Sequence, residues 1–127
     1  MNDKARLLQQ RTHTFFVAVL RLCERLPANT ATRQIAPQLI DSAGSTDSNY
    51  RAACRARSTA EFVAKMGIAA EEADESKGWL EALLASNNAP PDAQPLVNEA
   101  DELTAIFVKS RKTAEAHLNA QKRQRRR

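Results

Sequence analysis

Four carboxylates stand within one helical turn near the middle of the sequence, at Glu71, Glu72, Asp74 and Glu75. Glu72 and Glu75 are three residues apart, so on a helix they share a face and could chelate a metal ion or act as an acid–base pair. Di-iron sites in helical bundles, however, need Glu-x-x-His pairs on facing helices. No glutamate here has a histidine three residues later, and the cluster therefore predicts neither a metal site nor a catalytic pair.

The acidic cluster has a second interpretation, in which arginines earlier in the chain neutralise it. Arg51, Arg55 and Arg57 precede the cluster and stand on the neighbouring predicted helix or at its end. Ion pairs between the two groups, inside one bundle or between subunits, would fix helix alignment more than they would add stability. We favour this structural interpretation.

Three aromatic residues could form a platform on which nucleic-acid bases stack. They are Tyr50, the only tyrosine, Trp79, the only tryptophan, and Phe62. All three stand at helical spacing among Ala and Leu residues, a pattern more typical of core and interface packing. In that case the polar groups of Trp79 and Tyr50 should find buried hydrogen-bond partners.

Basic residues gather at the C-terminal end of the sequence. Residues 109–127 contain eight Lys and Arg and one acid, Glu115, so this segment has a net charge of +7. The whole chain has a net charge of +4, and the remaining residues therefore carry −3. Such a cluster can bind phosphates through counterion release, without reading base sequence. The alternatives are a solvated, disordered terminus and cations that suit the end of a helix dipole. The candidate nucleic-acid-binding residues are Lys109, Arg111, Lys112, Lys122, Arg123, Arg125, Arg126 and Arg127.

Other chemistry finds no support in the residue pattern. The sequence contains no nucleophile–His–acid arrangement, no Gly-rich phosphate loop and no zinc-ligand spacing. Cys23 and Cys54 stand far apart on apolar helical faces, as small core residues do in a reducing cytosol. We therefore predict that the protein is not an enzyme and carries no cofactor or metal.

Length and composition indicate a single all-α domain. The 127 residues suffice for one hydrophobic core, and Gly (3) and Pro (5) are scarce beside Ala, Leu, Glu, Arg and Lys. No stretch alternates apolar and polar residues long enough to predict a strand. No apolar run resembles a signal sequence or reaches membrane-spanning length, so we expect a cytoplasmic protein without membrane contact.

Periodic apolar residues predict four helices, at about residues 3–26, 30–56, 58–85 and 93–120, followed by a basic tail at 121–127. Short or stiff links between them predict an antiparallel, up-and-down four-helix bundle. The first helix carries two adjacent apolar stripes, which indicate burial on more than one side and self-association. The main stripe consists of Leu8, Thr12, Phe15, Val19, Leu22 and Leu26, and the second of Phe16, Leu20 and Cys23.

Capping residues and a run of small residues mark the second and third helices. Thr30 is a candidate N-cap, and Ser58 with Glu61 forms a capping box in which Glu61 reaches back to the Ser58 amide. Residues 42–49 are small and polar and include Gly44, and a glycine inside a helix costs ~1 kcal/mol. Because the apolar period continues through this waist, we predict one continuous helix. A helix break near Gly44 is the alternative.

A motif in the second and third helices carries a resemblance to a known family. With this motif in place, the chain resembles the small four-helix-bundle proteins encoded in 23S ribosomal RNA intervening sequences and their free-standing bacterial relatives. The chain departs from that family at Asp47-Ser48, where an apolar residue followed by glycine is usual. The matching residues are Asn49-Tyr50-Arg51-Ala52, Arg57-Ser58, Glu61-Phe62, Glu72-Ala73-Asp74-Glu75-Ser76 and Trp79-Leu80.

The resemblance implies a cytosolic protein that assembles into a ring, typically of five bundles, and that has no established enzymatic activity. It also implies distant kinship with accessory proteins of diversity-generating retroelements, which resemble basic barrels that bind nucleic acid and a reverse transcriptase. Two functional hypotheses follow. The first is a homopentamer that binds RNA or DNA without sequence preference through its basic C-terminal segment. The second is a scaffold for an unidentified protein partner, without nucleic-acid contact.

Overall fold

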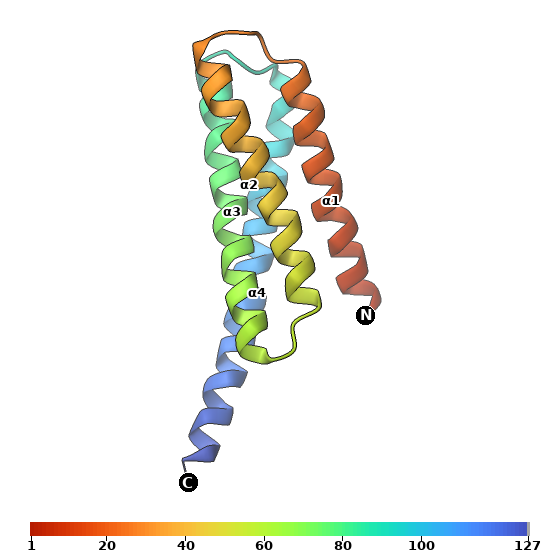
Figure 1. Cartoon of the computed structure of the whole chain (residues 1–127), viewed down its shortest axis with the longest axis vertical. Coiled ribbons are helices and arrows are strands. Elements are labelled where there is room, and N and C mark those ends of the chain that lie inside the picture. The colour runs from red at the N-terminus through yellow and green to blue at the C-terminus, as the bar shows by residue number, and fades with distance from the viewer. Residues whose placement is uncertain (127) are drawn as a thin grey trace.

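The structure, a computed structural model, describes residues 1–126 and consists of four long helices (Figure 1). They are α1 (Asp3–Glu24), α2 (Thr30–Cys54), α3 (Thr59–Ala85) and α4 (Gln94–Arg125), with a short 3-10 turn, η1 (Pro91–Ala93), ahead of α4. No strand occurs within residues 1–126. The prediction of an all-α chain with four helices is confirmed.

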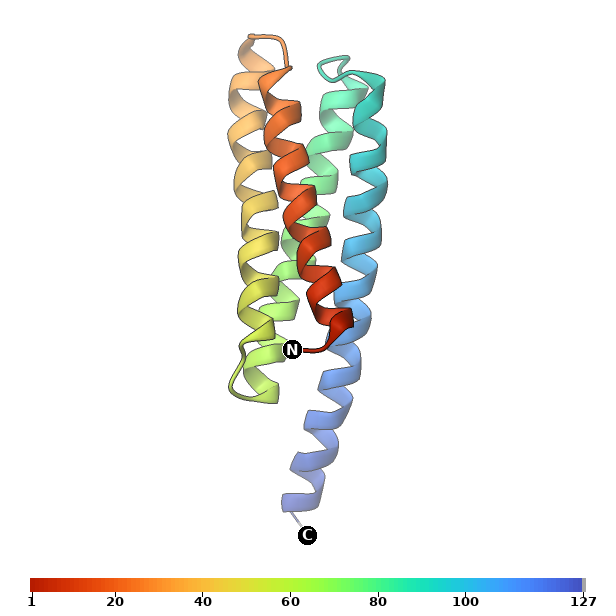
Figure 2. The same cartoon turned by 90° about the vertical axis from the view of Figure 1, so that its right-hand side faces the viewer.

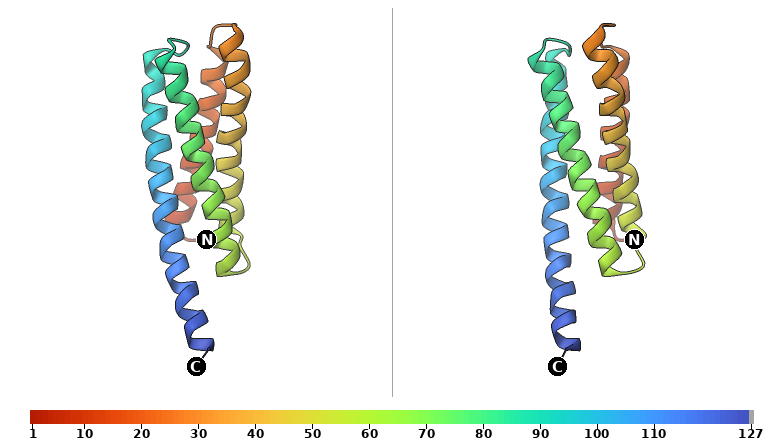
Figure 3. Two further views of the ribbon diagram at one scale, coloured as in Figure 1. Left: turned by 90° about the vertical axis from the view of Figure 1, so that its left-hand side faces the viewer. Right: turned by 60° about the vertical axis from the view of Figure 1, so that its left-hand side comes forward.

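The four helices lie side by side, and each runs opposite to the one before it along the chain (Figure 2). Helix α3 packs extensively against both α2 and α4, whereas α1 packs mainly against α2 and makes few contacts with α4. Helix α4 is the longest, and its last turns project beyond the loop that joins α2 to α3 (Figure 3). The bundle therefore has one end from which α4 protrudes.

Helix α4 extends to Arg125, five residues past the predicted boundary at residue 120, so most of the predicted tail is helical. Lys, Arg and Gln are good helix formers, and no Gly or Pro follows Pro95 to stop the helix earlier. The basic residues of the last turn also interact favourably with the helix dipole. Helix α1, by contrast, ends at Glu24, two residues before its predicted end.

The caps of α2 and α3 differ in part from the prediction. Ser58 is the N-cap of α3 and accepts from the Glu61 amide at 3.1 Å, as predicted. The Glu61 carboxylate, however, accepts from the amide of Arg57 at 3.3 Å rather than from that of Ser58. The N-cap of α2 is Asn29 and not Thr30, because the Asn29 side chain reaches the amide of Thr32 and the Thr32 hydroxyl accepts from the Asn29 amide in return.

The main apolar stripe of α1 faces the core, and four of its residues are buried. Phe16 and Cys23 of the second stripe are only partly buried and pack against the same core. In α4 the first buried residue is Val97, while Leu96 is only partly buried, since the buried stripe of this helix begins with a spacing of three. The buried residues of these two stripes are Thr12, Phe15, Val19, Leu22, Val97, Ala100, Leu103 and Phe107.

The small residues of the waist bring α2 close to its neighbours without breaking it. Helix α2 is continuous through Gly44, so the predicted continuous helix is confirmed and the break is wrong. A Cβ atom at Gly44 would lie 3.1 Å from Cζ of Phe16 on α1. On the opposite side, the buried hydroxyls of Ser42 and Ser76 share a hydrogen bond of 2.8 Å between α2 and α3. Glycine and serine thus provide the space in which three helices meet.

The contact between Ser42 and Ser76 also sets which charges face each other across α2 and α3. In this opposite-running pair, the acidic cluster lies level with residues 43–47. Arg51 lies about 8 Å from Glu72 along the helix axis, at 1.5 Å per residue, and pairs instead with Asp47 at 3.0 Å. Within residues 1–126, no ion pair joins the cluster to the three arginines. The predicted pairing inside one bundle is therefore wrong, and pairing between subunits stays a prediction.

Without a basic partner, the carboxylates of the cluster repel one another. Burial raises the pKa of Glu72, and the negative charges of Glu75, Glu71 and Asp41 raise it further. A carboxyl group with a raised pKa binds its proton more tightly in the folded chain than in the unfolded chain. Ionised Glu72 therefore lowers stability at neutral pH.

We expect the substitution Gly44→Leu to destabilise the protein by about 2 kcal/mol, because the added side chain must displace the Phe16 ring. The matched control is Gly78→Leu, since a Cβ atom at Gly78 meets nothing within 4 Å. The control should gain up to about 0.8 kcal/mol from helix propensity. Denaturant midpoints of both variants measure this, and equal stabilities would show that α1 does not approach α2 at Gly44.

The substitution Glu72→Gln should raise the melting temperature at pH 7 and leave it unchanged near pH 3. Below the unfolded pKa of a glutamate, about 4.3, the wild-type side chain is neutral too, and the penalty of its charge disappears. Thermal unfolding followed by circular dichroism at the two pH values measures the effect. Glu81→Gln, at an exposed position of the same helix, is the control. The same pH profile for both variants would contradict the assignment.

Candidate functional site

The fold separates positive from negative charge along the bundle axis. We define the basic end as residues 1–12, 48–70 and 108–126, where α1 begins, α2 passes into α3 and α4 projects (Figure 1), and the acidic end as residues 13–47 and 71–107. The basic end contains fourteen Lys and Arg and three Asp and Glu, whereas the acidic end contains four and twelve. Charges that are scattered in the sequence thus form a molecule with two oppositely charged ends.

Seven of these cations come from outside the C-terminal segment, and sequence reasoning did not assign any of them to the nucleic-acid site. Because α1 and α3 begin at this end and α2 finishes there, their termini meet the basic part of α4. The directions of the predicted helices could have identified them, because in an up-and-down bundle the start of one helix and the end of the next lie at the same end of the molecule. These residues are Lys4, Arg6, Arg11, Arg51, Arg55, Arg57 and Lys65.

Most cations of the basic end have no ion-pair partner among the described residues. Of its three carboxylates, Asp3 pairs with Arg6 at 2.6 Å and Glu115 lies 3.4 Å from Arg111. Arg11 reaches out of the basic end and binds two glutamates of α4. The ten without an ion pair in residues 1–126 are Lys4, Arg55, Arg57, Lys65, Lys109, Lys112, Lys122, Arg123, Arg125 and Arg126.

The predicted nucleic-acid-binding cations of α4 differ in exposure. Lys109 and Lys112 are exposed and one helical turn apart, and four further cations on the last turns are also exposed. Arg111 is different, because it is half-buried and its side chain lies against Gly67 of α3, with Cδ 3.6 Å from the place of a Cβ atom. Arg127 lies outside the described residues. The exposed cations of the last turns are Lys122, Arg123, Arg125 and Arg126.

The aromatic residues do not form a stacking platform for bases. Tyr50 is only 5% exposed, and its ring stacks on that of Phe107 with a centroid distance of 5.3 Å. Burial raises the pKa of the Tyr50 hydroxyl. Phe62 and Trp79 are partly buried against the core. The interpretation as packing residues agrees with these positions.

One part of that interpretation is wrong, because the indole Nε1 of Trp79 is buried without a hydrogen-bond partner in residues 1–126. The atom lies on a helix whose backbone carbonyls already accept helical hydrogen bonds. The side chain itself is partly buried and packs against the hydrophobic core. The Trp79 ring is thus held by packing alone.

The remaining residues of the family motif have structural contacts. The Asn49 side chain donates to the Ser45 carbonyl at 2.9 Å. Asp47, at the position where this chain departs from the usual pattern, is buried and accepts from Arg51 at 3.0 Å. The same carboxylate lies 3.0 Å from Nδ1 of His13. Sequence reasoning did not find the contact with His13, which joins α1 to α2 across 34 positions of the chain.

A second polar connection ties α1 to α4, two helices that make few contacts with each other. The guanidinium of Arg11 donates from Nε and Nη2 to the carboxylate of Glu99, at 2.8 and 2.7 Å, and from Nη2 to Glu102 at 2.9 Å. The hydrogen bond to Glu99 raises the pKa of Arg11. A two-pronged contact of this kind fixes geometry more strongly than a single ion pair does.

A groove of about 1370 Å³ opens at the basic end, between the first turns of α1, the α2–α3 junction and α4. Its floor includes Tyr50, Phe62 and Ile106, and Lys4 and Lys109 stand among the residues that line it. No carboxylate lines the groove among the residues that the structure describes.

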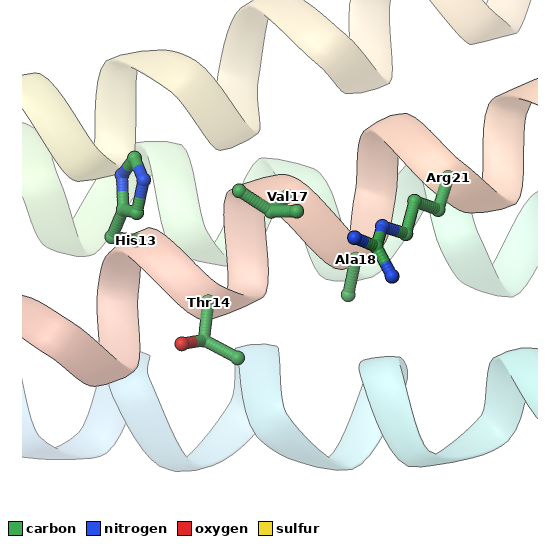
Figure 4. A pocket seen from close by; sticks show the side chains of 5 residues that line it. All are labelled: His13, Thr14, Val17, Ala18 and Arg21. Atoms are coloured by element: carbon green, nitrogen blue, oxygen red, sulfur yellow. The ribbon is translucent and has the colours of Figure 1, made fainter.

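A second, shallow hollow of about 310 Å³ lies on the outer surface of α1 (Figure 4). His13 and Val17 lie toward α2, and Thr14 and Ala18 toward α4 (Figure 4). The imidazole of His13 contacts the Asp47 carboxylate at 3.0 Å, but within residues 1–126 no hydrogen bond joins it to the Thr14 hydroxyl, so these residues do not form a catalytic triad. Within residues 1–126, no group of three or more His, Cys, Asp or Glu is placed to hold a metal ion. None of the described helices combines the length and the apolar character that crossing a membrane requires.

Comparison with known proteins connects this fold to one family. The family model described as 23S rRNA-intervening sequence protein matches residues 6–109. A crystal structure of a protein with unknown function, from the S23 ribosomal protein family of Bacteroides thetaiotaomicron VPI-5482, has a TM-score of 0.73 and 24% sequence identity. That similarity covers 86% of this chain and 98% of the other and shows a shared fold. No curated protein matches the chain.

The family model covers the motif residues but not the projecting end of α4. The matched range contains every motif residue from Asn49 to Trp79 and ends at Lys109, ahead of the projecting end of α4. The basic end therefore combines residues inside the family model with cations beyond it. Because the family model spans most of the sequence, this chain belongs to the 23S rRNA-intervening sequence protein family.

Proposed function

We propose that this protein is a non-catalytic, cytoplasmic, self-associating bundle that binds the phosphate backbone of RNA or DNA through its basic end. The observation that carries the proposal is the segregation of charge, with fourteen cations and three carboxylates at one end of the molecule. A polyanion gains most from a surface where positive charges are many and their internal partners few. The ten cations without an ion pair in residues 1–126 provide such a surface.

Binding of this kind reads the backbone and not the bases. The four exposed cations of the last turns of α4 lie within about 160° of the helix circumference, at about 100° per residue, so they form one broad positive face. Base-specific recognition needs side chains that are fixed against base edges. Tyr50, which could have stacked on bases, is buried against Phe107. We therefore expect affinity that depends steeply on salt and weakly on sequence.

Assembly would strengthen weak contacts of this type. We propose a ring of subunits, with five favoured by the resemblance described for the sequence, so that several basic ends bind one nucleic acid and their affinities combine. Two of the three residues of the second apolar stripe of α1, Phe16 and Cys23, pack against their own core and so offer no surface for assembly. The proposal of a ring therefore rests on the resemblance, and in that ring the basic ends stay free to bind phosphate.

The variant Lys122→Gln/Arg123→Gln/Arg125→Gln/Arg126→Gln should bind generic RNA and duplex DNA more weakly and with a smaller salt dependence. Each phosphate contact contributes about 0.9 to the slope of log K against log [salt] for duplex DNA, so the slope should fall by up to about three to four. Fluorescence anisotropy titrations at several salt concentrations measure both quantities.

Two further variants complete this test. Arg55→Gln/Arg57→Gln changes the end of α2, and the salt slope should fall here too if the whole basic end contacts phosphate. Arg21→Gln/Arg33→Gln removes two exposed cations from the acidic end and should leave binding unchanged. The proposal fails if the four-residue variant keeps wild-type affinity and slope.

Light scattering on the purified protein should give the mass of several subunits at micromolar concentration, with five favoured. A ring of five 14.1 kDa chains should give about five times the mass of one chain. A single-chain mass at low salt and micromolar concentration would contradict the proposed ring. It would leave the binding of nucleic acid by one bundle to be judged by the titrations.

A further inference from the structure

The groove at the basic end leaves large apolar side chains exposed. Only three large hydrophobic residues are exposed in residues 1–126, namely Met1 (74%), Leu7 (61%) and Ile68 (38%). Met1 and Leu7 both line the groove. Exposed apolar surface that is gathered in one concave place and rimmed by polar groups is typical of a binding site for a protein segment. Phosphate groups are bound by cations and hydrogen-bond donors, so an exposed apolar surface does not contribute to binding them.

One wall of the groove is a stripe of α4 that continues the core pattern past the end of the packed bundle. Ile106, Ser110 and Ala114 follow each other at intervals of four and line the groove, and Gln121 lies further along the same helix. Such a neutral, small-residue stripe is the surface against which a helix packs in a bundle. First turns of α1 form the facing wall, where α1 makes few contacts with α4. The space between these walls has the form that an added helix fills.

The charges around the groove favour a bound helix that is negatively charged. Lys4, Arg57 and Lys109 line it, and no carboxylate does so among the described residues. We infer that the groove binds an amphipathic helix of a partner protein, with its apolar face against Leu7 and Ile106 and glutamates or aspartates on its flanks beside these cations. This site goes beyond nucleic-acid binding, because it uses an apolar floor and not only positive charge.

A second copy of the chain is a poorer occupant than a foreign helix. The surface of the right charge on another copy is its acidic end, but none of the three exposed large hydrophobic residues lies there. The carboxylates of α3 stand on a helix whose apolar face is already buried in its own bundle. A copy could thus satisfy the cations of the groove and would leave its floor uncovered.

The test uses a fluorescein-labelled synthetic peptide of about 18 residues, which makes five helical turns, with leucines on one face and glutamates on both flanks. Fluorescence anisotropy with the full-length protein should give a dissociation constant that is roughly micromolar. A scrambled peptide of the same composition lacks the apolar face, and a version with lysines in place of the glutamates lacks the charge. Both should bind at least about tenfold more weakly.

Two charge-matched variants locate the peptide on the protein. Leu7→Glu puts a carboxylate into the groove, and Ile68→Glu adds the same charge to the basic end outside it. Both positions are exposed, so both variants should fold, which circular dichroism checks. Leu7→Glu should weaken peptide binding at least about tenfold, and Ile68→Glu should change it less than about threefold. Equal losses in both variants, or no binding of the acidic amphipathic peptide, would overturn the inference.

The same variants separate this inference from the proposed function. RNA titrations should show equal, small effects of Leu7→Glu and Ile68→Glu, because each changes one charge of the basic end. If the protein binds the peptide at the groove and does not bind RNA, the proposed nucleic-acid function fails and the groove assignment stands. If RNA binds and the peptide does not, the groove assignment fails alone.

Discussion

The close approach of three helices at the waist of α2 is the constraint on which the rest of the structure depends. Gly44 leaves room for the Phe16 ring of α1, and the hydroxyls of Ser42 and Ser76 meet at 2.8 Å between α2 and α3. A large side chain at either place would separate the helices, because close-packed cores tolerate little added volume. The hydroxyl pair joins α2 and α3 at one level, and each hydroxyl also contacts a backbone carbonyl of its own helix, that of Leu39 or of Glu72. The waist therefore fixes both the spacing and the register of the bundle.

Register in turn decides where the charges lie. With Ser42 opposite Ser76, the acidic residues of α3 lie level with the middle of α2, and the arginines at the end of α2 lie level with the start of α3. Arg51 consequently finds its partner on its own helix, at Asp47, and the acidic cluster keeps its charge unpaired by these arginines. Burial of Glu72 raises its pKa, and the negative charges of Glu75, Glu71 and Asp41 raise it further. The charges of the acidic cluster and of the arginines at the end of α2 thus stay at opposite ends of the molecule and do not pair between α2 and α3.

This sorting places two different surfaces side by side at the basic end. The projecting turns of α4 present a broad face of cations, which suits a polyanion, whereas the groove beside them combines cations with Leu7 and other apolar groups. An extended positive surface attracts both nucleic acid and acidic protein segments over distance, and only the apolar floor distinguishes between them at contact. We propose that a bundle of this kind holds a protein partner next to bound nucleic acid.

The sequence by itself determined the all-α class, the four helices and the buried stripe of α1, because apolar residues at intervals of three and four specify a helix face locally. It also determined the Ser58 cap and the continuity of α2 through Gly44. It did not determine the partners of the acidic cluster, the unpartnered indole of Trp79 or the cations that Lys4, Arg55 and Lys65 bring to the site. Those depend on how one helix is aligned with the next, and a shift of a few residues along a helix moves a charge by more than the reach of an ion pair. Only the tertiary structure decided them, through contacts between residues that are far apart in the chain.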